Sequence, residues 1–338
     1  MFKNKKILIT GGTGSLGFNL AKRLLNTDAD AIRILSRNEN KQVTMQDHLV
    51  DDRLRFFIGD IRDYHRLLRA FEDVDIIYHA AALKHVPIIE YNPFEAIKTN
   101  IIGSQNVIDA AIEQNVEKVI CIGTDKSVSP VNTYGATKLL MEKLFVTAMN
   151  YFNPKNHRTK FVALRYGNVL GSSGSVVPKF IEQIKSKKKI TITDPKMTRY
   201  SLTMEEALNF ILDATEISKG GEVFIPKLLK AYSIMDLKMA LEELLGKTGE
   251  EFISIRAGEK MHEALLNSDE LRYTWEFNDK YIIFDGERNP NIINEKYPGI
   301  KKVESDIAYS SDRVKKMSID EIKKTIIDAG LVEIGKIK

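Results

Sequence analysis

The sequence Gly11-Gly12-Thr13-Gly14-Ser15-Leu16-Gly17 decides the fold of this chain. It follows the apolar run Lys6–Thr10 and opens the amphipathic segment Phe18–Leu25. Strand, glycine turn and helix in this order predict a cradle for the pyrophosphate of a dinucleotide, because backbone N–H groups at a helix N-terminus bind phosphate. The glycines fit two spacings, one that starts at Gly11 and one that starts at Gly12. A purely structural glycine turn is the alternative interpretation.

Apolar runs recur along the first half of the chain at the spacing of buried parallel strands. They cover residues 7–9, 32–35, 54–58, 76–79, 119–122 and 161–165. Helical periodicity fills residues 94–114 and 134–150 between them. This alternation predicts an α/β fold, a Rossmann-type doubly wound parallel sheet, whose strand ends line one cleft.

After about residue 170 the regular alternation fades. We therefore expect a Rossmann domain at residues 1–170 and, at residues 171–338, mainly a smaller C-terminal substrate-binding lobe. This lobe is expected to contain a strand at 222–225, and two return segments can re-enter the main sheet, so the boundary is soft.

Composition is that of an ordinary globular protein. The 338 residues carry a net charge of +4, with 43% hydrophobic and 28% charged residues. No basic cluster indicates a nucleic-acid partner, and no residue set indicates a metal site. Cys121 is the single cysteine, so no intrachain disulfide forms. With no signal peptide and no apolar run long enough for a membrane helix, a cytoplasmic protein is expected.

The end of the second predicted strand indicates which nicotinamide cofactor is bound. The sequence there is Ser36-Arg37-Asn38-Glu39-Asn40-Lys41. A guanidinium with a nearby lysine favours the 2′-phosphate of NADP, whereas an acidic residue at this place usually binds the ribose of NAD. In the alternative interpretation Arg37 and Lys41 are solvated charges and Glu39 takes the ribose. Asp60, after the third strand, is a candidate acceptor for the adenine amino group.

Tyr134 and Lys138 stand one helical turn apart and project from the same face. A free tyrosine is a poor base at neutral pH, but a lysine ammonium and a cationic nicotinamide beside it favour the phenolate. The pair then accepts a carbinol proton while hydride leaves for the cofactor. A surface Tyr–Lys pair of structural role is the alternative.

The chain resembles the extended short-chain dehydrogenase/reductase superfamily and, within it, the inverting UDP-N-acetylglucosamine 4,6-dehydratases. The resemblance covers nearly the whole chain. The motifs that carry it are Thr10–Gly17, Ser36-Arg37, Phe57–Asp60, His79–Pro87, Lys98–Asn100, Thr124–Lys126, Tyr134–Lys138, Arg165–Val169, Thr193–Arg199 and Arg256–Lys260.

The triplet Thr124-Asp125-Lys126 separates the candidate reactions within this superfamily. Retaining dehydratases resemble Thr-Asp-Glu at this point, with the glutamate as base, and Lys126 replaces that glutamate. A lysine acts as a base only when neutral, and we expect burial beside another cation such as Lys138 to lower its pKa.

The resemblance implies a three-step cycle on UDP-N-acetylglucosamine. Tyr134 takes the C4 hydroxyl proton as hydride passes to NADP; Lys126 then removes the C5 proton while Asp125 protonates the departing C6 hydroxyl. Hydride returns to C6 and C5 is reprotonated on the opposite face. The product is UDP-2-acetamido-2,6-dideoxy-β-L-arabino-hex-4-ulose, a precursor of pseudaminic acid and related surface glycans.

The remaining site residues follow from the resemblance as well. The catalytic set is Thr124, Asp125, Lys126, Tyr134 and Lys138. Cofactor contacts are expected from Gly11 to Gly17 and from Ser36, Arg37, Asn38, Lys41, Asp60, Ile61, Ala80, Ala82, Lys84, Asn100, Tyr134 and Lys138. Substrate contacts are expected from Lys84, Thr124, Asn168, Val176, Arg199, Arg256 and Glu259. The family also implies a homo-oligomer.

Two other functions stay open. A UDP-hexosamine 4-epimerase would release a 4-epimer that keeps the C6 hydroxyl. A catalytically silent NADP-binding sensor is the second alternative, and the intact Asp125, Tyr134 and Lys138 argue against it.

Overall fold

The computed structural model describes residues 1–332 except 154, 173, 228–229, 257 and 285–288. Within this part of the chain a mixed central sheet of ten strands organises the fold. In order across the sheet the strands are β15 (Lys301–Lys302), β13 (Thr274–Phe277), β14 (Lys280–Phe284), β9 (Glu222–Pro226), β6 (Lys160–Leu164), β5 (Lys118–Ile122), β4 (Ile76–His79), β1 (Lys6–Thr10), β2 (Ala31–Ser36) and β3 (Leu54–Ile58).

The seven strands from β3 to β9 run parallel, and β13 to β15 add an antiparallel edge. Chain order reverses between β1 and β4, which is the point where ligands bind in open parallel sheets. The predicted strands are confirmed, and so is the doubly wound fold.

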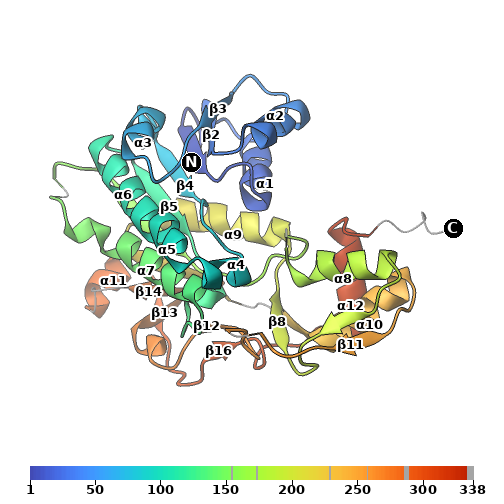
Figure 1. Ribbon diagram of the computed structural model, residues 1–338. Coiled ribbons are helices and arrows are strands. Elements are labelled where there is room, and N and C mark those ends of the chain that lie inside the picture. Colours follow the sequence, from blue (N-terminus) through green and yellow to red (C-terminus); the bar gives the residue numbers. More distant parts are fainter. Residues whose placement is uncertain (154, 173, 228–229, 257, 285–288, 333–338) are drawn as a thin grey trace.

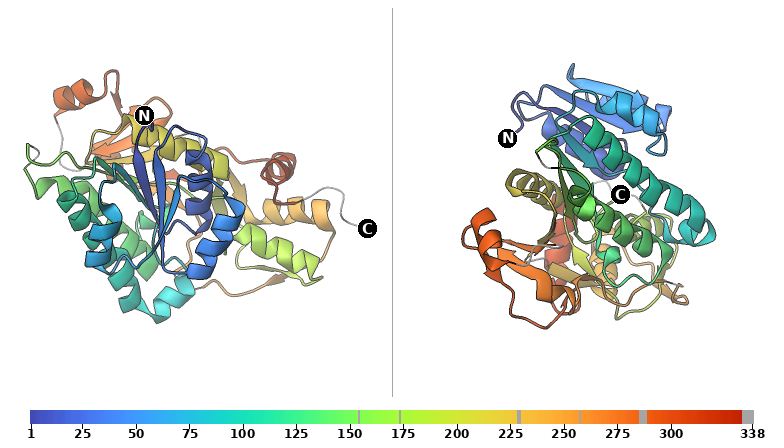
Figure 2. Two further views of the ribbon diagram at one scale, coloured as in Figure 1. Left: turned by 90° about the horizontal axis from the view of Figure 1, so that it is seen from above. Right: turned by 90° about the vertical axis from the view of Figure 1, so that its left-hand side faces the viewer.

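Helices cover both faces of this sheet (Figures 1 and 2). In chain order they are α1 (Ser15–Leu24), α2 (Glu39–His48), α3 (Tyr64–Phe71), α4 (Val86–Tyr91), α5 (Pro93–Ala96), α6 (Gly103–Glu113), α7 (Thr133–Thr147), α8 (Val176–Lys185), α9 (Met204–Ile217), α10 (Ile234–Leu245), α11 (Pro290–Lys296) and α12 (Ile319–Asp328). The expected helix at 94–114 is interrupted by a π-helical stretch, η1 (Ile97–Ile102). Short 3-10 turns are η2 (Asp125–Ser127), η3 (Ala148–Asn150) and η4 (Glu270–Tyr273).

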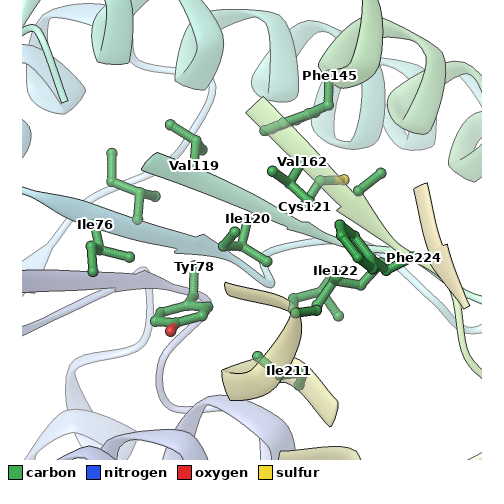
Figure 3. Packing of buried hydrophobic residues seen from close by; sticks show 14 of the residues in the cluster. Ile76, Tyr78, Val119, Ile120, Cys121, Ile122, Phe145, Val162, Ile211 and Phe224 are labelled. Atoms are coloured by element: carbon green, nitrogen blue, oxygen red, sulfur yellow. The ribbon is translucent and has the colours of Figure 1, made fainter. Parts of the chain in front are cut away.

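The core lies where the central strands meet these helices. Figure 3 shows Phe145 of α7 and Ile211 of α9 packed against opposite faces of β4, β5 and β6. Strand β5 is buried along its whole length, as a continuous apolar run predicts. Cys121 lies in this core, and burial holds the pKa of its thiol above the usual value. It is therefore a packing residue.

A second, smaller core lies beside the main sheet and packs α8, α10 and α12 together (Figure 1, right). Three short strand pairs accompany it: β7 (Ile190–Ile192) with β11 (Glu250–Phe252), β8 (Thr198–Ser201) with β10 (Lys230–Ser233), and β12 (Ala264–Leu266) with β16 (Tyr309–Ser310). Strands β9, β13, β14 and β15 follow residue 170 yet belong to the main sheet, so the chain passes between the two cores more than once. The domain limit at 170/171 stays a prediction.

Two further features concern possible partners. None of the helices in the described ranges is long and apolar enough to cross a membrane. Among the same residues no group of three His, Cys, Asp or Glu side chains is arranged to hold a metal ion.

Candidate active site

The glycine turn joins β1 to α1, and most of its residues line the cleft. Gly11 has φ +65°, and a Cβ there would lie 2.8 Å from the Ala81 Cα atom. A Cβ on Gly17 would lie 2.6 Å from the Gly12 Cα atom, so these two glycines let the helix approach the strand. A Cβ on Gly14 would meet only the Gly11 carbonyl oxygen, at 3.2 Å. Gly14 therefore keeps space at the helix N-terminus, which fits a pyrophosphate.

A cleft of about 1810 Å³ begins at this turn and runs past the carboxyl ends of the parallel strands. Most predicted site residues line it: Gly11, Thr13, Gly14, Ser15, Leu16, Gly17, Ser36, Arg37, Asn38, Lys41, Asp60, Ile61, Ala80, Ala82, Lys84, Thr124, Lys126, Tyr134, Lys138 and Asn168. Gly12, Asn100 and Asp125 lie behind this lining. Val176, Arg199, Arg256 and Glu259 do not line the cleft.

The charged residues at the end of β2 face an acidic neighbour. Arg37 is half exposed, and its guanidinium lies 3.7 Å from Asp60 Oδ2. Asp60 is also bound by Arg62, which donates to Oδ2 at 2.7 Å. Two guanidinium groups therefore meet one carboxylate. Asn38, predicted as a cofactor contact, caps α2 by accepting from the Lys41 backbone N–H.

Three acceptors surround the amine of Lys126 in the turn η2. Its Nζ atom lies 3.0 Å from Asp125 Oδ1, 2.9 Å from Asn168 Oδ1 and 3.3 Å from Glu263 Oε1. An ammonium has three N–H donors and no acceptor, so this surrounding matches the protonated lysine.

Lys126 is therefore a cation in this arrangement. Burial would lower its pKa, but the Asp125 and Glu263 carboxylates outweigh that effect and raise it. The expectation that Lys138 helps to neutralise Lys126 is wrong, because two carboxylates sit at its amine and the Lys138 amine donates to the Ile122 carbonyl oxygen at 2.6 Å.

Asp125 is fully buried, and its two oxygens differ. Oδ1 accepts from the Thr124 hydroxyl at 2.9 Å and from Lys126. Oδ2 has no hydrogen-bond partner among the described residues. Burial raises the pKa of Asp125; Lys126 opposes this and the Glu263 charge adds to it. A carboxyl with a raised pKa and one free oxygen is suited to act as a general acid.

Tyr134 and Lys138 both lie in α7 and line the cleft, as the Tyr-x-x-x-Lys pattern predicts. Burial raises the pKa of Tyr134 to about 12, although Lys126 favours the phenolate. We expected Lys138 to lower the pKa of the Tyr134 phenol. In the structure the cation that lowers it is Lys126. Burial lowers the pKa of Lys138 itself.

Asn100, predicted to contact the cofactor, fastens the loop after β4 to α7. Its side-chain amide donates to the Leu83 carbonyl at 3.0 Å and to Thr137 Oγ1 at 3.0 Å, and its Oδ1 atom accepts from the Leu83 N–H. Thr137 Oγ1 in turn donates to the Tyr134 carbonyl oxygen. The π-helical turn η1 carries Asn100, which is consistent with the concentration of such turns at functional sites.

Two predicted substrate residues of the second half, Arg199 and Glu259, do not line the cleft but are linked to Lys126 through Glu263. Arg199 is buried, donates to the carbonyl oxygens of Thr198, Lys260 and Met261, and lies 3.8 Å from Glu259. Arg256 is exposed. The following residue of that predicted motif, Ala257, lies outside the described residues.

Sequence reasoning missed Glu263. It is 3% exposed and contacts both Lys126 and Arg199. The one available signal was its position four residues after Glu259 in the motif that starts at Arg256. Nothing in that spacing says which of the two carboxylates reaches the reaction centre.

Taken together, the strand order, the glycine turn and the Tyr134–Lys138 pair define a member of the extended short-chain dehydrogenase/reductase class, and known proteins agree. The family model described as polysaccharide biosynthesis protein matches residues 7–285, and the chain belongs to this family.

Similar proteins carry two different activities in their names. A protein of Campylobacter jejuni named UDP-N-acetylglucosamine 4,6-dehydratase (inverting) is 48% identical over 322 residues, which are 92% of this chain and 94% of the relative. A protein of Rickettsia felis named UDP-glucose 4-epimerase is 40% identical, over 98% of both chains. The solved structure of Pen from Bacillus thuringiensis has a TM-score of 0.90 and 39% identity, and the match covers 98% of this chain and 99% of that one.

Proposed function

We propose that this protein dehydrates UDP-N-acetylglucosamine across C4 to C6 with inversion at C5. The observation that carries the proposal is that Lys126 and Tyr134 line one cleft with the glycine turn, while Asp125 lies directly behind Lys126 and contacts its amine at 3.0 Å. The 48% identity to the Campylobacter jejuni inverting dehydratase supports it. A dinucleotide with a nicotinamide ring, when bound, supplies an acceptor and donor of hydride.

In the first step Tyr134 accepts the proton of the C4 hydroxyl, and C4 becomes a ketone. The Lys126 ammonium favours the phenolate form that this step needs. Asn100 and Thr137 fix the start of α7, so the phenol keeps one position in the cleft. The ketone then acidifies the C5–H bond.

For the elimination, one proton transfer prepares both groups. When the Lys126 ammonium gives its proton to Asp125 along their 3.0 Å contact, the pair becomes an amine and a carboxylic acid. The amine takes the C5 proton, and the acid protonates the departing C6 hydroxyl, which leaves as water. This order of proton transfers explains how a lysine that is charged before the substrate binds can serve as the base.

We assign NADP as the preferred dinucleotide, because Arg37 and Lys41 line the cleft at the end of β2, and a guanidinium with a nearby lysine favours a 2′-phosphate. Asp60 already contacts Arg37, so the preference depends on how far the phosphate displaces that carboxylate. NAD, with Glu39 on the ribose, is the alternative.

Substrate contacts are assigned to Lys84, Thr124, Asn168, Val176, Arg199, Arg256 and Glu259. We also propose that the protein is a cytoplasmic homo-oligomer. A role in surface-glycan synthesis is supported by the family description, polysaccharide biosynthesis protein. The division at 170/171 remains our proposed boundary between the cofactor and substrate parts.

Incubation of the purified protein with UDP-N-acetylglucosamine, followed by NMR of the sugar, tests the proposal. A 4-keto-6-deoxy sugar is the expected product. The similarity to the Rickettsia felis protein favours 4-epimerisation as the second candidate, which would leave the C6 hydroxyl in place. A sensor without catalysis would return the sugar unchanged.

A further inference from the structure

Among the residues that the structure describes, Glu263 is the one buried carboxylate at the reaction centre for which the proposed mechanism gives no task. Its Oε1 atom lies 3.3 Å from the Lys126 amine and 3.9 Å from Arg199 Nε. Its Oε2 atom is buried without a hydrogen-bond partner among the described residues. A carboxylate so deeply buried is retained at a high desolvation cost, so its place at the catalytic lysine calls for a reason.

The protein holds Glu263 rigidly. Its backbone N–H donates to Ser311 Oγ at 3.0 Å, and the Ser311 N–H donates back to its carbonyl oxygen at 2.7 Å. The same segment is tied to the active-site side of the cleft: Lys260 donates to the Val128 carbonyl oxygen at 2.5 Å, and Asn132, the N-cap of α7, donates to the Gly258 carbonyl oxygen at 2.8 Å. These hydrogen bonds from the small lobe thus hold the Glu263 carboxylate beside η2.

We propose that Glu263 is a positioning residue whose negative charge keeps the proton of the elimination on the Asp125–Lys126 pair. This inference rests on the proposed function, since it concerns the acid of the dehydration step. Asp125 and Lys126 exchange one proton between them, so they titrate as a unit. While that proton is present the pair is neutral overall, and after its loss to solvent the pair carries one negative charge. A second carboxylate in contact with Lys126 disfavours the negative state.

Charged and titratable groups reach this carboxylate from several elements. They are Asp125 and Lys126 from η2, Tyr134 from α7, Arg199 from β8 and Lys260 from the segment that leads to Glu263. Burial alone would raise the pKa of Glu263, but the three cations lower it, so Glu263 stays ionised while Asp125 receives the proton. The pKa of Asp125 is raised and that of Glu263 is lowered, so Asp125 is suited to be the acid and Glu263 to be the fixed negative charge beside it.

The sign of the effect is fixed by this account. Elimination requires the shared proton, so its rate falls as pH rises through the pKa of the pair. Glu263→Gln removes the charge that raises this pKa and keeps the size of the side chain. The falling limb of the kcat/KM profile for 4-keto-6-deoxy product should therefore move to lower pH, by about one pH unit or more.

Two matched variants separate this role from a structural one. Glu263→Asp keeps the charge, so its falling limb should lie closer to that of the wild type than that of Glu263→Gln. Glu242→Gln removes another buried, ion-paired carboxylate of the small lobe, in α10, and should not move the limb. A limb that stays in place or moves to higher pH in Glu263→Gln overturns the proposal.

A measurement on the wild type covers the case in which Glu263→Gln does not fold. In the free enzyme the shared proton is on Lys126. With substrate bound, once this proton has passed to Asp125, infrared spectra should show a protonated carboxyl band at about pH 6, where an ordinary aspartate is ionised, and Asp125→Asn should remove the band. No such band in the wild-type enzyme with substrate bound contradicts the inference. A wild-type enzyme that makes no 4-keto-6-deoxy sugar contradicts the proposed function instead, so the two failures are distinct.

Discussion

At the scale of single residues, the three acceptors around Lys126 decide what this side chain does. They hold it as an ammonium before substrate binds, and the contact with Asp125 gives its proton somewhere to go. In the proposed mechanism the base for C5 and the acid for C6 are then products of one transfer. A glutamate at position 126 would need no such step, which makes the lysine a distinct chemical solution to the same deprotonation.

Lys126→Ala should stop water loss but leave the oxidation at C4. Without the amine no group is placed to take the C5 proton, so elimination should slow by about 10²–10⁴-fold. Reduced-cofactor absorbance in a single turnover should still appear and then persist. Lys185→Ala, which removes an exposed lysine at the end of α8, is the control. Near-normal dehydration by Lys126→Ala would make the residue a binding cation only.

Arg37→Asp should weaken binding of NADP much more than binding of NAD. The change removes the guanidinium and adds a carboxylate beside Asp60, so a 2′-phosphate meets two negative charges. Titration of each dinucleotide by isothermal calorimetry measures the difference. Arg272→Asp makes the same charge change in the exposed turn η4. An unchanged ratio of the two affinities in Arg37→Asp would remove the basis of the NADP assignment.

At the scale of elements, the glycines between β1 and α1 have two separate roles. Gly17 lets α1 lie close to β1, and Gly14 leaves room for a ligand. Gly17→Ala should destabilise the fold by about 1–3 kcal/mol, since its Cβ would overlap the Gly12 backbone. Gly14→Ala should cost less stability than Gly17→Ala but weaken dinucleotide binding, because its Cβ would meet only the Gly11 carbonyl oxygen, at 3.2 Å, and would narrow the space at the helix N-terminus. Melting curves with and without dinucleotide compare the two variants. Equal loss of stability in both would refute this division.

Strand β4 carries a buried histidine that should make the fold sensitive to acid. His79 accepts or donates at both ring nitrogens, to Thr10 and Ser104, and burial lowers its pKa to about 3. The unfolded chain binds this proton below the ordinary pKa of about 6.5, so stability is full above that pH and falls as pH drops toward 3.

We expect this group to contribute a slope of about 1.4 kcal/mol per pH unit between roughly pH 4 and 6. Urea unfolding at several pH values should show a smaller slope in His79→Gln than in the wild type. His48→Gln, at an exposed position of α2, should keep the wild-type slope. Identical slopes in all three proteins would mean that His79 is not the titrating group.

At the scale of the whole molecule, sequence patterns predicted the parallel part of the sheet well, because buried strands are continuous apolar runs. The glycine turn at Gly11 between a strand and a helix added a second signal for the same fold. They predicted which residues line the cleft along the first 170 residues for the same reason: strand ends meet at one edge. The protonation of the site was mispredicted. The sign of the shift at Lys126 depends on Glu263, which lies 137 positions along the chain and whose approach is set by packing of the small lobe.

Our central claim is that hydride leaves C4 and returns to C6 of the same sugar. UDP-N-acetylglucosamine with deuterium at C4 tests this claim most directly. The account predicts that NMR and mass spectrometry find this deuterium in the C6 methyl group of a 4-keto-6-deoxy product, because hydride leaves C4 and returns to C6 within one turnover. In heavy water the unlabelled substrate should gain one deuterium at C5, on the inverted face. Deuterium that stays at C4 in a product with an intact C6 hydroxyl would contradict the account and indicate an epimerase.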